Sequence, residues 1–173
     1  TVVAMGDSLT NDLQSWFEVV RVVVGRARPD RRVRWVNAGV SGETTLHLVA
    51  RAGEVALVRP AWVFVLAGTN DARRHGAAGP LLTPDETRRN LGRIRNLVSP
   101  EGRARVVWIT PPGVLPERIA RDARFARGAV SWRAEEQQAV ARAVRGMEGP
   151  VVDVAAEWGE PPPADWISED GVH

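Results

Sequence analysis

Residues 62–71 read WVFVLAGTND, and this stretch decides the fold class. Its first part, Trp62–Ala67, is a continuous apolar run that is rich in valine and aromatic residues. A run of this length and composition predicts a β-strand, because β-branched and aromatic side chains pack well on a pleated surface. The lack of alternation is typical of a parallel sheet that helices cover on both faces. The polar residues Gly68–Asp71 then mark the carboxyl end of the strand.

Similar short apolar runs alternate with longer helical patterns on either side of this strand. The other expected strands are Thr1–Met5, Arg32–Val36, Arg105–Thr110 and Val151–Val154. The expected helices are Leu13–Val24 with Asn11 or Asp12 as its N-cap, Thr45–Val58, a helix from Thr83-Pro84 to about Leu97, and Ser131–Met147. Strands that alternate with helices imply right-handed crossovers. The sequence therefore predicts an α/β fold, a three-layer α/β/α sandwich with a five-stranded parallel sheet, as a single domain over residues 1–173.

The composition excludes several kinds of site and partner. The chain has no cysteine, which rules out disulfides, cysteine-ligated zinc, iron–sulfur clusters and a cysteine nucleophile. All 23 basic residues are arginines, yet the formal net charge is only +2, so we expect no nucleic-acid partner. The apolar runs are shorter than the ~20 residues that cross a bilayer, so no membrane span is expected. The compartment stays open: the cytoplasm is slightly favoured, and secretion follows if a signal peptide precedes Thr1.

Polar clusters follow the expected strands at the points where open parallel sheets bind ligands. They are Gly6–Thr10, Asn37–Gly42 and Gly68–Asp71, and a further cluster, Asp170–His173, ends the chain. Because the carboxyl ends of parallel strands lie along one edge of the sheet, these clusters can converge in space although they are far apart in sequence.

The clusters hold complementary groups for nucleophilic catalysis. Ser8 is a poor nucleophile until a base takes its proton, and His173 can act as that base. Asp170 precedes this histidine by three residues and can bind the other ring nitrogen, which fixes the tautomer. The backbone N–H of Ser8, a backbone N–H that Gly39 allows to approach closely, and the side-chain amide of Asn70 can form an oxyanion hole.

In order and spacing, the clusters resemble the four sequence blocks of the GDSL, or SGNH, hydrolases. The matching residues are Gly6-Asp7-Ser8-Leu9, Asn37-Ala38-Gly39 followed by Gly42, Gly68-Thr69-Asn70-Asp71 and Asp170-x-x-His173. The resemblance implies a flavodoxin-like SGNH hydrolase fold that needs no metal and no cofactor. It also implies that Ser8 is the nucleophile and that Asp170 and His173 are the acid and the base. Gly39 and Asn70 correspond to the glycine and the asparagine of the oxyanion hole.

One departure from the family pattern concerns the end of the chain. Family members normally continue beyond the histidine with a proline and a final helix that covers the sheet, whereas this sequence ends at His173. Either the chain is cut at the motif, and the C-terminal helix of the family is missing, or the remainder lies beyond this sequence. If the chain is cut there, we expect an exposed apolar face and a poorly held His173.

The motif residues also have structural interpretations, as helix caps or turn residues. His75 is the alternative base, but no carboxylate stands three residues before it, and neighbouring arginines disfavour its protonation. His47 lies within a helical pattern and is interpreted as a surface or packing residue. Asp7 and Asp71 are interpreted as structural residues that hold their turns.

Two further groups are interpreted as substrate-binding. Trp158 and Trp166 flank a proline-rich segment before His173 and can line an acyl pocket. Arginines recur every three residues in the long connection after the fourth expected strand: Arg118, Arg121, Arg124 and Arg127. On a helix they would form a cationic stripe, which is either solvated surface or a rim where Arg121 and Arg124 attract anionic substrates.

The sequence therefore predicts a serine hydrolase that cleaves a carboxylic ester or thioester through an acyl-Ser8 intermediate. The nearest alternative is an acyltransferase that passes the same acyl group to an alcohol. A non-catalytic binding domain of the same fold is a second alternative. The expected partner is a small-molecule substrate, and the arginine rim would favour coenzyme A or acyl-carrier thioesters. Acyl length, leaving group and oligomeric state stay open.

Overall fold

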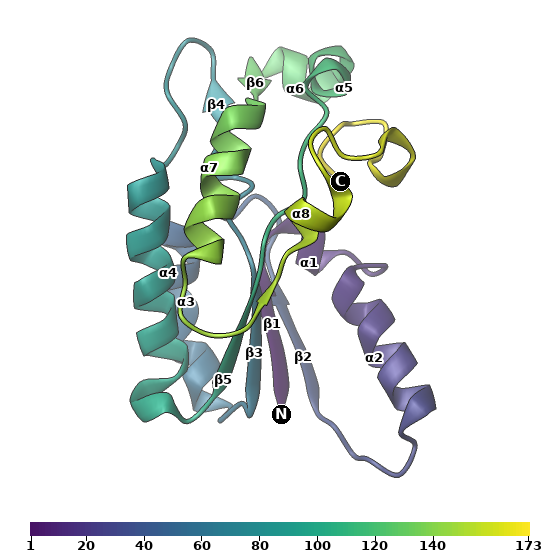
Figure 1. Cartoon of the computed structure of the whole chain (residues 1–173), viewed down its shortest axis with the longest axis vertical. Coiled ribbons are helices and arrows are strands. Elements are labelled where there is room, and N and C mark those ends of the chain that lie inside the picture. Colours follow the sequence, from purple (N-terminus) through teal and green to yellow (C-terminus); the bar gives the residue numbers. More distant parts are fainter.

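Five parallel strands form the central sheet of the computed structural model, which describes residues 1–173 (Figure 1). The strands are β1 (Val2–Gly6), β2 (Trp35–Gly39), β3 (Trp62–Leu66), β5 (Arg105–Ile109) and β7 (Val151–Val152). Their order across the sheet is β2-β1-β3-β5-β7, which confirms the predicted five-stranded parallel sheet. The chain reverses its direction across the sheet between β1 and β3. Ligands bind at such a switch point, beyond the carboxyl ends of the strands.

Four longer helices cover the two faces of the sheet. They are α2 (Trp16–Ala27), α3 (Thr45–Leu57), α4 (Pro84–Val98) and α7 (Ala134–Arg145). Helices α3, α4 and α7 lie on one face and α2 lies on the other, so the predicted three-layer architecture is confirmed (Figure 1). The short elements are α1 (Ser8–Asn11), β4 (Arg74–His75), η1 (Pro100–Gly102), α5 (Pro116–Arg121), α6 (Ala123–Arg127), β6 (Val130–Ser131), α8 (Val154–Trp158) and η2 (Ala164–Trp166).

Alternate strand residues point to opposite layers, which divides the apolar side chains between two packing surfaces. Val63, Val65 and Trp108 are buried in the larger core beneath α3, α4 and α7. Phe64 points to the other face, where its ring lies 6.1 Å from that of Trp16 at the start of α2. Each fully buried side chain of this size contributes about 1.5–3 kcal/mol. Packing on both faces therefore holds the strand ends, and the polar groups that follow them, in place.

The structure corrects the expected start of the second-layer helix. The helix predicted over Leu13–Val24 begins at Trp16, and its N-cap is Ser15, not Asn11 or Asp12. Asp12 Oδ1 accepts a hydrogen bond of 2.7 Å from the backbone N–H of Gln14, which closes a turn between α1 and α2. Such local side-chain to backbone bonds compete with helix formation.

Two other boundaries differ from the expectation because pairing and burial, which depend on distant residues, decide them. Strand β2 (Trp35–Gly39) overlaps the predicted Arg32–Val36 segment but is shifted by three residues toward the C-terminus. Val33 remains exposed, whereas Ala38 packs against the core. The helix predicted from Ser131 begins at Ala134, because β6 pairs with β4 in a small antiparallel sheet. The long connection after β5 contains α5 and α6, two short helices that no sequence pattern had placed.

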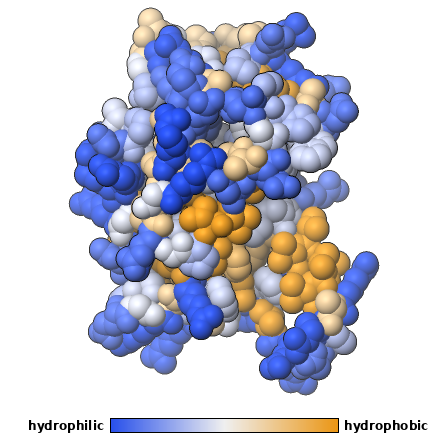
Figure 2. All heavy atoms as spheres, in the orientation of Figure 1, coloured by the Kyte–Doolittle hydropathy of each residue, from blue (hydrophilic) through white to orange (hydrophobic).

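Helix α2 leaves part of its apolar surface exposed (Figure 2). Val19, Val22 and Val23 are among the large apolar side chains that face solvent. These exposed valines form an apolar strip on the outer side of α2. No helix of the structure combines the length and the apolar character that crossing a bilayer requires.

Candidate active site

Ser8 lies at the turn where β1 ends and α1 begins. Asp7 caps this short helix, because its Oδ1 accepts a hydrogen bond of 3.1 Å from the backbone N–H of Leu9. The turn is possible only with glycine at position 6: a Cβ there would lie 2.3 Å from Thr10 Oγ1 and 2.4 Å from the carbonyl oxygen of Leu66. The close contact between β1, β3 and α1 therefore determines where the Ser8 hydroxyl lies.

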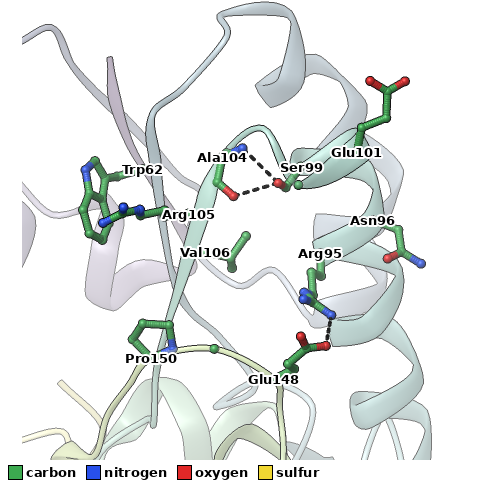
Figure 3. A pocket seen from close by; sticks show the side chains of 12 residues that line it. Trp62, Arg95, Asn96, Ser99, Glu101, Ala104, Arg105, Val106, Glu148 and Pro150 are labelled. Carbon is green, nitrogen blue, oxygen red and sulfur yellow. Dashed lines mark hydrogen bonds and ion pairs between the residues drawn. The ribbon is translucent and has the colours of Figure 1, made fainter.

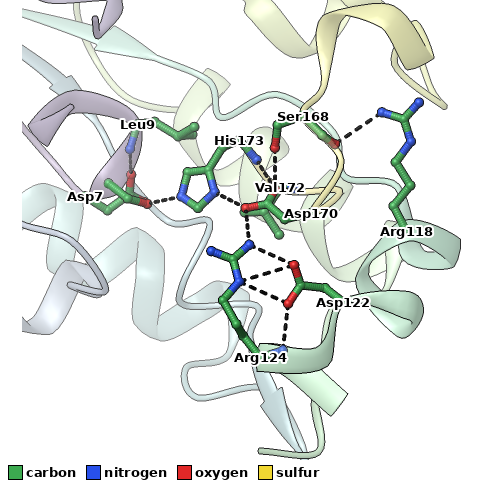
Figure 4. A network of polar contacts seen from close by, with 10 residues as sticks. Asp7, Leu9, Arg118, Asp122, Arg124, Ser168, Asp170, Val172 and His173 are labelled. Carbon is green, nitrogen blue, oxygen red and sulfur yellow. Dashed lines mark hydrogen bonds and ion pairs between the residues drawn. The ribbon is translucent and has the colours of Figure 1, made fainter. Parts of the chain in front are cut away.

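The His173 ring connects Ser8 to Asp170. Its Nε2 lies 2.8 Å from Ser8 Oγ, and its Nδ1 lies 2.7 Å from Asp170 Oδ2. Figure 4 shows the ring between Asp170 on one side and the turn that carries Asp7 and Leu9 on the other. The backbone N–H of His173 also donates to Asp170 Oδ1 at 3.0 Å, so the expectation that His173 is poorly held is wrong. The structure thus brings three of the predicted site residues into one hydrogen-bonded chain.

Asp170 is held as a carboxylate by its surroundings. Burial by itself would raise the pKa of Asp170, but hydrogen bonds outweigh it and hold this pKa well below its ordinary value. Oδ1 accepts from Ser168 Oγ at 2.6 Å and from the backbone N–H groups of Val172 and His173. An aspartate that is ionised at every working pH can keep the histidine ring in one orientation and one tautomer.

Helix α5 supports the segment that carries Asp170. Arg118 Nη1 donates to the backbone carbonyls of Ile167 and Ser168 at 2.5 and 3.2 Å. The N–H of Leu115 donates to the carbonyl of Gly171 at 2.8 Å. Gly171 has a φ of +81°, and a Cβ there would lie 2.6 Å from the Leu115 carbonyl oxygen, so only glycine fits. The α5 segment and the C-terminal segment therefore pack closely and are joined by hydrogen bonds, which holds Asp170 in place.

Asn70 follows β3 and points its side-chain amide toward the turn that carries Ser8. Its Nδ2 donates to the carbonyl of Glu43 at 3.1 Å and lies 3.4 Å from Asp7 Oδ2. The side chain is buried. Asn70 is thus held between the ends of β1 and β2 by its bond to Glu43. The other amide hydrogen faces Asp7 Oδ2 at 3.4 Å, longer than an ordinary hydrogen bond, and can be given to an oxygen bound beside Ser8.

The structure corrects the predicted role of Gly39. Its backbone N–H donates to Asn37 Oδ1 at 2.9 Å, so it is not free for an oxyanion. A Cβ at this position would lie 2.5 Å from the backbone nitrogen of Asn11, so the glycine is required for packing between β2 and α1. Gly39 is therefore a packing residue.

Gly42 is the residue that the sequence interpretation missed. It has a φ of +81° in the loop after β2, and its N–H has no backbone acceptor. The next residue, Glu43, accepts the hydrogen bond from Asn70, so this loop lies beside the amide of Asn70. The sequence did contain a signal for this residue, because Gly42 is the second glycine of the Asn37–Gly42 cluster. Spacing alone did not show that it is a better candidate for a backbone donor than Gly39.

The remaining predicted alternatives lie away from Ser8. His75 is exposed in β4, and Nδ1 of His47 accepts the N–H of Thr44 at 3.1 Å within the capping box of α3. Asp71 accepts hydrogen bonds from Thr45 at 2.8 and 2.6 Å, as expected for a structural residue. No cluster of three or more His, Asp or Glu side chains has the arrangement of a metal site.

The sequence model of the GDSL-like lipase/acylhydrolase family matches residues 4–173. The chain belongs to this family. The match covers nearly the whole chain and includes the four polar clusters that surround the site. It supports ester hydrolysis as the general activity of the protein.

Solved structures resemble this GDSL-like hydrolase in fold. A lipase/acylhydrolase from Enterococcus faecalis superposes with a TM-score of 0.73 at 22% identity, covering 99% of this chain and 86% of that chain. An acetylxylan esterase from Geobacillus stearothermophilus gives a TM-score of 0.68 at 20% identity, with 99% and 85% covered. An α/β hydrolase from the metagenome of Lake Arreo, Spain, gives 0.69 at 20% identity, with 99% and 86% covered. No curated protein matches the chain by sequence.

An apolar cavity of about 470 Å³ opens beside Ser8 and His173 of this GDSL-like hydrolase. Trp158 lines it, as predicted, whereas Trp166 does not line it. The Trp166 ring packs edge-on against that of Trp158 at 5.4 Å and supports the wall from outside. The other hydrophobic residues that line the cavity are Leu9, Trp16, Leu66, Ile109, Val152 and Val154.

A larger cavity of about 730 Å³ lies at the opposite edge of the sheet, where β3 and β5 begin (Figure 3). Trp62 and Arg105 line one part of it, and the guanidinium of Arg105 lies 5.2 Å from the Trp62 ring centroid. Its serine, Ser99, is engaged with the backbone of Ala104 at 2.7 and 2.9 Å. This cavity holds no histidine beside a serine, so size alone does not identify the reactive site.

The arginines of residues 118–127 do not form one cationic stripe. Helix α5 ends and helix α6 begins at Asp122, so the arginines lie on two helices and their spacing of three residues does not correspond to one helix face. Arg118 binds backbone carbonyls, and Arg124 pairs with Asp122 and Asp170. Of the two arginines predicted to bind substrate, Arg121 alone is exposed without an ion pair.

Asp7 gives this hydrolase a distinctive dependence of stability on pH. Burial raises the pKa of its carboxyl group from 3.8 to about 7. Between these pH values the unfolded chain loses this proton and the folded chain keeps it, so raising the pH removes stability, about 4 kcal/mol in total. We expect the free energy of unfolding of Asp7→Asn, measured with urea from pH 4 to pH 8, to lack this decrease.

The exposed Asp12→Asn variant is the matched control for that experiment, and its stability should follow the wild-type curve. If the curves of Asp7→Asn and wild type ran parallel over the whole range, Asp7 would not be the titrating group.

Proposed function

We propose that the protein is a serine hydrolase that cleaves carboxylic esters through an acyl-Ser8 intermediate. The observation that carries this proposal is the continuous contact from Ser8 Oγ through the His173 ring to Asp170, with distances of 2.8 and 2.7 Å. His173 Nε2 takes the hydroxyl proton as Ser8 attacks the ester carbonyl carbon, and returns it to the leaving alcohol. Water, deprotonated by the same nitrogen, then releases the acid and restores Ser8.

Three donors are proposed to stabilise the negative oxygen of the tetrahedral intermediates. They are the backbone N–H of Ser8, Asn70 Nδ2 and the backbone N–H of Gly42, which takes the place expected for Gly39. The buried and fixed Asn70 amide supports this assignment, because a donor that needs no reorganisation stabilises the charge as it develops.

The cavity beside Ser8 supports an apolar acyl or alcohol group as the part of the substrate that binds there. Seven of its 13 lining residues are hydrophobic, Trp158 among them. Arg118 and Arg124 are engaged in internal contacts, which leaves little free positive charge for an anionic carrier. We therefore propose neutral carboxylic esters as substrates in preference to coenzyme A or acyl-carrier thioesters.

A fluorophosphonate probe tests the proposed nucleophile, and p-nitrophenyl esters and acyl thioesters of increasing chain length test the substrate class. We expect labelling of wild type, no labelling of Ser8→Ala, and turnover of the neutral esters. Ser131→Ala is the matched control and should label like wild type. Absence of labelling in the folded wild-type protein would contradict the proposal and favour a binding domain. Product analysis with an added alcohol separates hydrolysis from acyl transfer.

A further inference from the structure

The guanidinium of Arg124 in α6 joins Asp170 to a second carboxylate, that of Asp122 (Figure 4). Its Nη2 lies 2.8 Å from Asp122 Oδ2 and 3.2 Å from Asp170 Oδ2. The same Oδ2 atom of Asp170 binds Nδ1 of His173 at 2.7 Å. Arg124 and the imidazole ring therefore share one acceptor oxygen.

Local structure holds this guanidinium in place although the Arg124 side chain is 70% exposed. Asp122 caps α6, and its Oδ1 accepts both the backbone N–H of Arg124 at 2.8 Å and its Nε at 3.1 Å. The guanidinium also lies 5.6 Å from the ring centroid of Phe125. An isolated exposed ion pair contributes little. A planar guanidinium already held by two neighbours, however, loses little freedom when it binds a further carboxylate.

The charged groups around the His173 ring come from several elements. Asp170 lies on its own segment and Arg124 comes from α6. Asp7 lies at the turn after β1, close enough to interact with His173 electrostatically, and Asp12 at the end of α1 lines the same cavity. Two further arginines lie nearby: Arg118 binds backbone carbonyls of the Asp170 segment, and Arg73 lies 3.4 Å from Asn70 Oδ1. Arg124 is the cation that contacts the Asp170 carboxylate itself, and its charge opposes the stabilising effect of Asp170 on a protonated ring.

We propose that Arg124 is a positioning residue for the base: it fixes Asp170 Oδ2 against the ring of His173 and places a positive charge beside that pair. This inference rests on the proposed function, in which the neutral ring accepts the proton of Ser8. Asp122 has the opposite electrostatic effect, because it neutralises part of the charge of Arg124.

The test compares the midpoint of the pH profile of kcat/KM in two variants that change the local charge in opposite directions. Arg124→Gln should move the midpoint up by about 0.5 unit, which corresponds to about threefold tighter proton binding. Asp122→Asn should move it down, because asparagine still caps α6 and leaves the charge of Arg124 uncompensated. Arg124→Lys keeps the charge, so its midpoint should lie close to the wild-type value. Arg127→Gln, on an exposed arginine of the same helix α6, should leave it unchanged.

The same midpoints are measured without turnover by NMR titration of the His173 ring. This readout separates the two proposals. Loss of fluorophosphonate labelling in wild type would defeat the proposed function, and an unchanged ring titration in Arg124→Gln would defeat the role of Arg124. Shifts in the same direction for Arg124→Gln and Asp122→Asn would also overturn it. The two substitutions change the local charge in opposite directions, so a shared direction would indicate disturbed structure and not an effect of charge. If Arg124→Gln does not fold, Asp122→Asn alone decides by the direction of its shift.

Discussion

Ser8→Ala and His173→Ala should each lower kcat by several orders of magnitude, on the order of 10⁴–10⁶. The hydroxyl and the ring nitrogen are 2.8 Å apart and act in one step, so removing either leaves the other without a function. The double variant should therefore be scarcely slower than either single variant. The measurement is kcat for a p-nitrophenyl ester, together with circular dichroism to show that each variant is folded.

The pH profile provides a second measure of the same assignment. Activity should rise with pH through one ionisation, because only the neutral ring of His173 accepts the serine proton. His75→Ala is the matched control, since His75 is exposed in β4 and lies outside the contact chain. A severe loss in His75→Ala with a mild loss in His173→Ala would show that the base has been assigned to the wrong histidine.

Asn70→Ala should lower kcat by roughly 10²–10³ with little change in KM. The amide is fixed by its contact with Glu43 before substrate binds, and it strengthens its interaction when charge develops on the substrate oxygen. Steady-state kinetics on one neutral ester separate the two constants. Asn96→Ala, an exposed asparagine on α4, is the control and should behave as wild type.

A variant of Asn70 that lost affinity while keeping kcat would assign this amide to ground-state binding. That result would remove Asn70 from the oxyanion hole and leave the backbone donors of Ser8 and Gly42 to act alone.

Features that depend on neighbouring residues could be predicted from the sequence. Helix α3 was expected over Thr45–Val58 and observed over Thr45–Leu57, because apolar spacing and a nearby proline are local signals. Strand β3 was likewise located to within one residue, since its composition favours a strand wherever it lies. The order of the polar clusters then indicated that Ser8, Asn70, Asp170 and His173 belong together.

Features that depend on distant hydrogen-bond partners were decided by the tertiary structure alone. Gly39 and Gly42 look alike in sequence. In the fold the N–H of Gly39 binds Asn37, whereas the N–H of Gly42 has no backbone acceptor and its neighbour Glu43 binds Asn70. The sequence indicated that Arg124 was either solvated surface or part of a substrate-binding rim, but the fold of α6 brings it within 3.2 Å of Asp170, 46 residues away in the chain. By itself the sequence determined which chemical groups the site contains, because residue types and local patterns carry that information. Which donors are free and which charges meet follows from packing between segments that are remote in sequence, so only the folded chain decides it.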